Sequence, residues 1–503
     1  MKRAATIAAA LIALPALCGD ARAHALAQRY DLPLPLGYFL AASGVVVAMT
    51  FVILAMFWRH SDKPIDARDD TILRGTVPDL LVAGLQLLAV LALTLLVAAG
   101  LFGNPATFKN ITPVAVWVIW WVGFGFLTAF IGNIWPLINP WSSTFGLVER
   151  LTRPWTRGLS FHVHYPRWLS VWPSCGLYLL FAWLELVAPG RDVPRNIAIA
   201  ILIYSAFTWT GFAIFGRDTW LKCGEVFSIA FGLFGRFAPL DFTHDDRWRV
   251  NLRPFATGLL PRTPLDPSMT AFSLLMLGTV TVDGFMETPL WAAAVEWVFA
   301  SHGNADANSW VYMAMQTALL IAGPLILAGL YLVVITLMAW ISGLQAANLS
   351  GLFVLSLIPI AIAYHLSHYF SLFAVAGQFI IPLASDPFGY GWDLFGTMLY
   401  RIDIGVVDAK SIWYLSVIAI VTGHVIAVWI GHVTANSVFR DSRSAGRSQY
   451  PMLVLMVCYT MLSLWILAQP IVEPNPKSPT QSHDRMSALG GKADMPFCAA
   501  HVR

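Results

Sequence analysis

The sequence predicts an all-α fold, a polytopic bundle of transmembrane helices, from three observations. Hydrophobic residues make up 57% of the 503-residue chain, and charged residues make up only 12%. The apolar residues lie in many separate runs of about 20, a length that crosses about 30 Å of hydrocarbon as a helix. Short polar loops separate these runs. We therefore expect one membrane domain embedded in a lipid bilayer, because spans and short loops account for most of the length.

The first 23 residues have the form of a cleavable secretory signal peptide. Lys2 and Arg3 precede an apolar run, and the run is followed by the small-residue triplet 21–23. This order is typical of export signals. The mature chain would then begin at His24, and the membrane domain would cover residues 24–470.

Ten apolar segments in that domain have the length and low charge of membrane spans. They are residues 38–57, 78–101, 113–135, 169–188, 197–215, 271–289, 310–340, 351–372, 411–433 and 451–469. The longest loop on the side predicted to be cytoplasmic, 216–270, carries Phe227, Phe231 and Phe234 at helical spacing. This spacing predicts a helix lying in the membrane interface or packed under the bundle. Residues 471–503, rich in Pro, Ser and Gly, predict a disordered periplasmic tail.

The distribution of basic residues predicts how the spans are oriented. Alternate loops hold 18 Lys and Arg residues, and the other set holds 6. The basic set is 58–77, 136–168, 216–270, 341–350 and 434–450; the other set is 24–37, 102–112, 189–196, 290–309 and 373–410. Short cytoplasmic loops carry the excess of positive charge. We therefore expect a bacterial inner-membrane protein with both ends of the mature chain in the periplasm.

Composition argues against several other functions. A net charge of +3 is too small to indicate nucleic-acid binding. The five cysteines form no CxxC pair, which gives no sign of a disulfide framework or a zinc ribbon. The chain also lacks a recognisable GxSxG, HExxH, P-loop or dinucleotide-binding glycine motif. Its partners are expected to be lipid and a small-molecule or metal-ion substrate.

The polar residues that call for an explanation lie in the stretch 361–370, AIAYHLSHYF, inside an apolar span. His365 and His368 are three residues apart and share one helical face. Ionisable residues at membrane depth are costly and usually face a protein interior or cavity. Asp283 and Glu287, four residues apart near the outer end of another span, lie at a similar depth, as does Glu185. A pocket facing the periplasm is therefore geometrically possible.

Three kinds of chemistry fit these residues. His365, His368, Asp283 and Glu287 could bind a transition metal, for which imidazole suits copper, zinc, iron or nickel. The same residues could relay protons or gate a substrate in a transporter. His365 and His424 could hold a haem between two helices. In the simplest alternative, each histidine only forms a hydrogen bond to a neighbouring helix.

Three stretches carry a resemblance to a known family. They are AHALAQRYDLPLPLGYFLAASG at 23–44, DGFMETPLW at 283–291 and AYHLSHYFSL at 363–372. Here the chain resembles bacterial multi-spanning membrane proteins named fenitrothion hydrolase, from the leader to about residue 470. The resemblance implies the same architecture and, nominally, hydrolysis of organophosphate esters. The motif positions it covers are Asp283, Gly284, His365, His368 and Tyr369.

If the chain is such a hydrolase, Asp283, His365 and His368 are the candidate catalytic residues. Hydrolysis of a phosphotriester at neutral pH generally uses water activated by a metal that histidine and carboxylate ligands hold. Asp283, His365, His368 and Glu287 could supply such ligands if their spans are neighbours. A carrier for a metal or proton, or a membrane assembly factor that binds haem or metal, fits the same residues.

Overall fold

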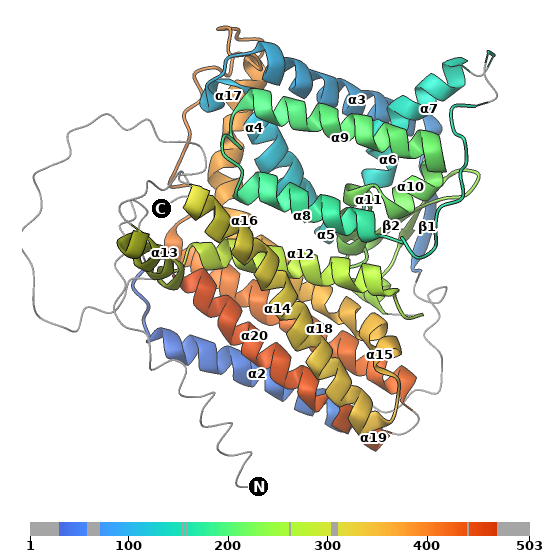
Figure 1. The fold of residues 1–503 in the computed structure, drawn as a ribbon. Helices are drawn as coiled ribbons and strands as arrows, with labels where there is room; N and C mark the ends of the chain where they lie inside the picture. Colours follow the sequence, from blue (N-terminus) through green and yellow to red (C-terminus); the bar gives the residue numbers. More distant parts are fainter. Residues whose placement is uncertain are drawn as a thin grey trace, which may run out of the picture.

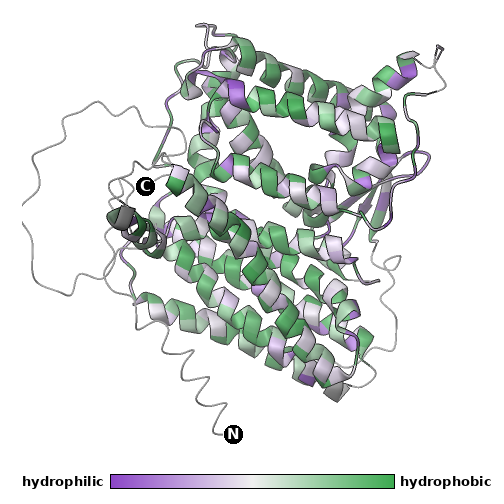
Figure 2. Cartoon of the chain, in the orientation of Figure 1, coloured by the Kyte–Doolittle hydropathy of each residue, from purple (hydrophilic) through white to green (hydrophobic). Residues whose placement is uncertain are grey.

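A computed structural model describes residues 30–57, 71–152, 154–155, 158–260, 263–302, 310–439 and 442–469. The predicted signal peptide (1–23) and tail (471–503) lie outside the described residues. Within the described ranges, nine helices are long and apolar enough to cross a membrane, which confirms the predicted class of fold. Figure 2 shows hydrophobic residues along these helices, with hydrophilic ones concentrated in the strands and loops.

The first half of the chain supplies four of the long helices. They are α2 (Leu36–Phe57), α3 (Asp79–Phe102), the continuous segment of α4 (Ile111–Pro113), η3 (Val114–Gly123) and α5 (Phe124–Phe130), and α9 (Pro194–Phe215). Segment η3 is π-helical, a rare geometry that is frequent at functional sites. The predicted span 169–188 forms a helix of only 15 residues, α8 (Trp172–Leu186). At 1.5 Å per residue α8 is about 22 Å long, short of the roughly 30 Å of a hydrocarbon core.

The second half supplies the other five long helices. They are α12 (Pro267–Met286), α14 (Trp310–Ser342), the segment 346–385, α18 (Ala409–Val438) and the segment 445–468, which includes α20 (Tyr450–Ala468). Segment 346–385 is broken into α15 (Ala346–Phe353), η5 (Val354–Leu357), α16 (Ile358–Ala376), η6 (Gly377–Phe379) and α17 (Ile380–Ser385). Shorter helices are α6 (Trp135–Ile138), α7 (Pro140–Thr152), α13 (Pro289–His302) and α19 (Ser442–Ser448).

The loops gather at two opposite ends of the bundle, as the alternation of spans requires. At one end, strands β1 (Leu73–Thr76), β3 (Trp248–Leu252) and β2 (Leu240–His244) form an antiparallel sheet in the order β1-β3-β2. At the other end, the loop after α3 bonds to the loop after α17, through Asn104 N and the Phe388 carbonyl. Figure 1 shows α13 and α17 at one edge and β1, β2, α15 and α19 at the opposite edge.

Helices α10 (Arg217–Cys223) and α11 (Val226–Gly235) form a hairpin that packs among the long helices. Trp220 of α10 packs against Phe207, partway along α9. Phe227 of α11 contacts Trp120 in the third spanning segment, with ring centroids 4.5 Å apart. Eight of the ten residues of α11 are buried. The predicted helix in loop 216–270 is therefore packed within the bundle and does not lie on its surface.

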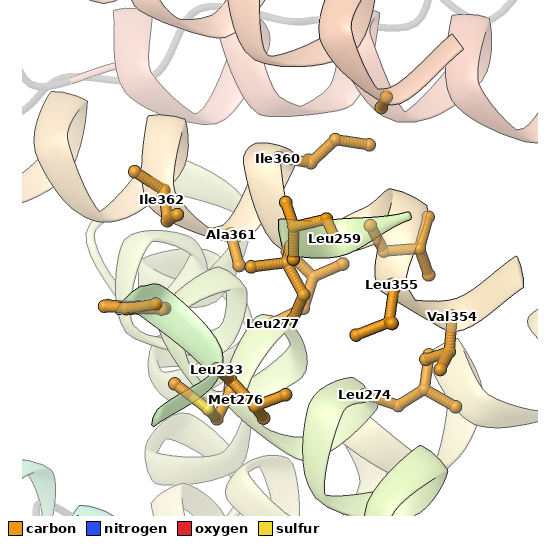
Figure 3. Packing of buried hydrophobic residues seen from close by; sticks show 14 of the residues in the cluster. Leu233, Leu259, Leu274, Met276, Leu277, Val354, Leu355, Ile360, Ala361 and Ile362 are labelled. Carbon is orange, nitrogen blue, oxygen red and sulfur yellow. The ribbon is translucent and has the colours of Figure 1, made fainter. Parts of the chain in front are cut away.

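The main core lies where α11, α12, η5 and α16 meet. Figure 3 shows this packing, with Leu233 of α11, Leu277 of α12 and Ile360 of α16 among the labelled side chains. Helices α16 and α18 approach closely at Gly423, where an added Cβ would lie 2.6 Å from the Ala363 Cβ. This core fixes α12 and α16 side by side, and these are the two helices that carry the predicted site.

Candidate functional site

The centre of the site is a buried carboxylate that bonds to a histidine and a tyrosine. His368 Nε2 lies 2.8 Å from Asp283 Oδ2, and the Tyr369 hydroxyl donates to the same oxygen at 2.6 Å. The His368 and Asp283 side chains are only 6% and 7% exposed. An ionised carboxylate can only accept, so both neighbours act as donors. Charge-assisted bonds of this kind are stronger than neutral ones.

The local sequence lets α12 and α16 come close enough for these bonds. Gly284 follows Asp283, and an added Cβ there would lie 2.4 Å from the Tyr364 hydroxyl oxygen. Tyr364 is fully buried, and its hydroxyl makes no hydrogen bond. Gly284 thus leaves room for the Tyr364 ring, one turn before His368 on α16. In the pair Asp283-Gly284, the aspartate accepts the hydrogen bonds and the glycine lets α12 and α16 approach closely.

His365 points to a different neighbourhood from His368. Its ring contacts Trp121, Phe126, Phe234 and Tyr369, with centroids 4.9–6.0 Å away. The side chain is buried, and Nε2 makes no hydrogen bond. Residues three apart on a helix differ by about 60° in direction, so one histidine faces α12 while the other faces the third spanning segment and α11.

A small cavity lies beside His365. It is lined by residues of the third spanning segment, α8, α11, α12 and α16, among them Trp121, Glu185 and Tyr369. Its volume of about 20 Å³ is room for about one water molecule. Glu185 and Glu287 are also near enough to His368 for their charges to act on the imidazole. The site therefore combines three carboxylates, two histidines and a tyrosine.

The predicted set of metal ligands is not assembled in this structure. Asp283 and His368 are bonded, Glu287 is the residue that ends α12, and His365 faces the aromatic cluster. The described residues include no group of three or more His, Cys, Asp and Glu side chains that could hold a metal ion. The roles of these four residues in catalysis or metal binding stay predictions.

His424, the predicted haem partner of His365, lies elsewhere. It is fully buried in α18, its Nδ1 lies 2.8 Å from the Ile420 carbonyl oxygen, and its ring is 6.2 Å from that of Tyr459 on α20. The close contact of α16 and α18 at Gly423 leaves no gap between these helices at that point. The two histidines thus have different neighbours, and a haem role for His424 stays a prediction.

Glu225, a residue that the sequence did not single out, lies at the tip of the α10–α11 hairpin. It is fully buried and caps α11 by accepting from the backbone N–H groups of Phe227 and Ser228. Trp135 Nε1, Asn139 Nδ2 and the Tyr204 hydroxyl also donate to it, at 3.1, 3.1 and 2.5 Å. These donors compensate for the burial of a carboxylate. Glu225 fixes the hairpin, and the only sequence signal was an acidic residue just before an apolar run.

Together the fold and site define a class, a multi-span helical membrane protein with a buried carboxylate–imidazole–phenol cluster. Such a cluster can take up, hold and release a proton. Comparisons with family models, with curated proteins and with solved structures give no match to this chain. The function is therefore argued from the site alone.

Proposed function

We propose that this protein is a proton-coupled membrane carrier in which Asp283 and His368 bind and release the coupling proton. The bond between His368 Nε2 and Asp283 Oδ2 carries the proposal. Ionisable residues inside membrane helices mark proton relays and substrate pathways in pumps and transporters. A buried pair that served only packing could be replaced by apolar residues with little loss of stability.

The broken helices support the same proposal. Segment 346–385 changes helix type on both sides of α16, and η3 is π-helical where it packs beside α16. Discontinuous helices are typical of carriers, in which irregular backbone lines a pathway. These irregular segments flank the helix that carries His365 and His368.

Proton coupling is tested with protein-containing liposomes on a solid-supported membrane. A step in external pH should produce a transient current that protein-free liposomes lack. Asp283→Asn and His368→Gln should abolish it. His432→Gln is the matched control, because His432 is also buried but bonds to Gln449 at 3.2 Å, away from the site. A wild-type current no larger than that of protein-free liposomes would rule out the proposal.

Hydrolysis of organophosphate esters is the second candidate, supported by the family resemblance and by a buried His–Asp pair that could act on water. A cavity of about 20 Å³ is far smaller than such an ester, so this function requires the helices to open. Purified protein should release nitrophenol from fenitrothion, and the His365→Ala/His368→Ala double variant should not. Mass spectrometry of the same samples measures bound copper, zinc or nickel; equal release by both proteins would locate the chemistry elsewhere.

For the orientation, we infer from loop charge that the chain lies in a bacterial inner membrane with its mature N-terminus in the periplasm. A phosphatase fused after Ser385 should be active, and one fused after Ser442 should be inactive. The opposite pattern would invert the orientation and would place the Asp283 end of α12 toward the cytoplasm.

A further inference from the structure

The polar side chains that line the cavity beside His365 are poorly matched as hydrogen-bond partners. His365 and Trp121 both line it, each residue is 6% exposed, and neither His365 Nε2 nor Trp121 Nε1 makes a hydrogen bond of normal geometry. Glu185 also lines the cavity and lies beside the Trp121 indole, although their contact lacks normal hydrogen-bond geometry. Two unpartnered polar atoms in one small space are uncommon in native interiors, where such groups are usually satisfied by protein or by water.

The size and chemistry of the cavity select its ligand. A volume of about 20 Å³ exceeds the roughly 10–15 Å³ that one water needs. The Trp121 N–H is a donor, while the Glu185 carboxylate is an acceptor. Water can accept from one and donate to the other, whereas an ammonium ion can only donate and would face the indole N–H unfavourably. A small apolar molecule would leave both unpaired.

We infer that this cavity binds one water molecule, held by Trp121 and Glu185 and bonded to His365. Tyr369 also lines the cavity, and its hydroxyl reaches Asp283. The water therefore connects Glu185 with the Asp283–His368 pair through Tyr369. Glu185, at the end of α8 that also carries the loop 187–193, becomes the outer residue of this connection.

The role of this water in proton transfer rests on the proposed function. When the Glu185 carboxylate has taken up a proton, it gives this proton to the water oxygen, and the water gives another proton to the Tyr369 hydroxyl oxygen. Tyr369 in turn passes its original hydroxyl proton to Asp283. At the water and at Tyr369 one O–H bond forms and one breaks, so the net change is one proton moved from Glu185 to Asp283.

The water site is tested without any transport assay, by radiolytic hydroxyl labelling and mass spectrometry of the protein in detergent. Radiolysis of a bound water oxidises the side chains next to it, so Trp121 and Met276, which line the cavity, should be labelled. Trp413 is the matched control because it is fully buried and its Nε1 is also unpartnered, but it does not line the cavity. Equal labelling of Trp121 and Trp413 would overturn the inference.

Filling the cavity should remove the label. Ala361, which lines the cavity, is changed to Leu; the expected result is loss of labelling at Trp121 and Met276. Ala83→Leu, on the exposed side of α3, controls for effects of the added side chain on membrane protein production. If Ala361→Leu does not fold, Ala182→Leu fills the same cavity from α8. Unchanged labelling in a folded cavity-filled variant would overturn the water site.

The connection to Asp283 is tested separately with Glu185→Gln. The amide keeps the size of the side chain but cannot carry the proton, so the transient current should be lost while labelling of Trp121 remains. A current equal to wild type would overturn the role of Glu185. If wild-type protein gives no current at all, the proposed carrier function fails, whereas the labelling of Trp121 and Met276 still decides whether the water is bound.

Discussion

Removing the Asp283 carboxylate should cost more stability than any other change at this site. In Asp283→Ala, His368 and Tyr369 lose the acceptor that they share. A buried donor left without a partner costs about 1–3 kcal/mol, so two should cost about 2–6 kcal/mol. Asp283→Asn keeps one acceptor oxygen, so its loss should be about half as large. Ser367→Ala, on the same helix as His368, removes only bonds to backbone carbonyls and should have a small effect.

Equilibrium unfolding of the protein in mixed detergent micelles measures these free energies. The decisive comparison is a double-mutant cycle of Asp283→Ala with Tyr369→Phe. Once the Tyr369 hydroxyl is absent, Asp283→Ala leaves one fewer donor unpaired, so the two losses should sum to more than the double variant shows. Losses that add within about 0.5 kcal/mol would mean that these residues do not interact, and the reasoning about the cluster would be refuted.

Three further predictions concern the surroundings of the site. Gly284→Ala should destabilise the protein by about 1–3 kcal/mol through overpacking, and Tyr364→Phe, which removes the clashing oxygen, should restore most of the loss in the same unfolding assay. Glu225→Gln should cost about 1–3 kcal/mol because an amide group then faces several donors; unchanged unfolding would contradict its role in fixing the hairpin. Asp266 caps α12, so Asp266→Ala should cost about 1 kcal/mol. Burial acts to raise the pKa of Asp266, but the hydrogen bonds that it accepts outweigh burial and lower this pKa. The cap therefore contributes at neutral pH, and its contribution is lost as the pH falls through that lowered value. A difference in stability between wild type and Asp266→Ala that does not shrink in acid would contradict this.

The pair that forms the centre of the site followed from helix geometry. Asp283 near the end of one span and His368 in the corresponding half of another were predicted to lie at similar depths, and depth limits which residues can meet. Helical spacing predicted that His365 and His368 share one face, but the angle of about 60° between their directions around the helix axis is enough to turn them toward different helices. Which helices are neighbours depends on packing across the bundle, which local periodicity does not contain.

The α10–α11 hairpin is a stronger example of packing that local periodicity does not predict. The apolar spacing of α11 predicted a helix, yet the same spacing fits an interfacial helix and a buried one. Its burial depends on Glu225, whose partners Trp135, Asn139 and Tyr204 come from distant segments. Glutamate is not among the preferred helix-capping residues, so the position gave no clear local signal. Glu185 was similarly ambiguous, because a carboxylate near a helix end is usually solvated.

The small sheet has a consequence for how the chain is made. β1 pairs with β3 so that Arg74 lies opposite Asn251, 177 residues later in the chain. At roughly 5–20 residues per second of translation, β1 waits for about 9–35 s before its partner leaves the ribosome. During that interval several spans must enter the membrane while one short polar strand stays unpaired. The order of synthesis therefore makes this sheet a late event, which closes only after the helices that it links have been inserted.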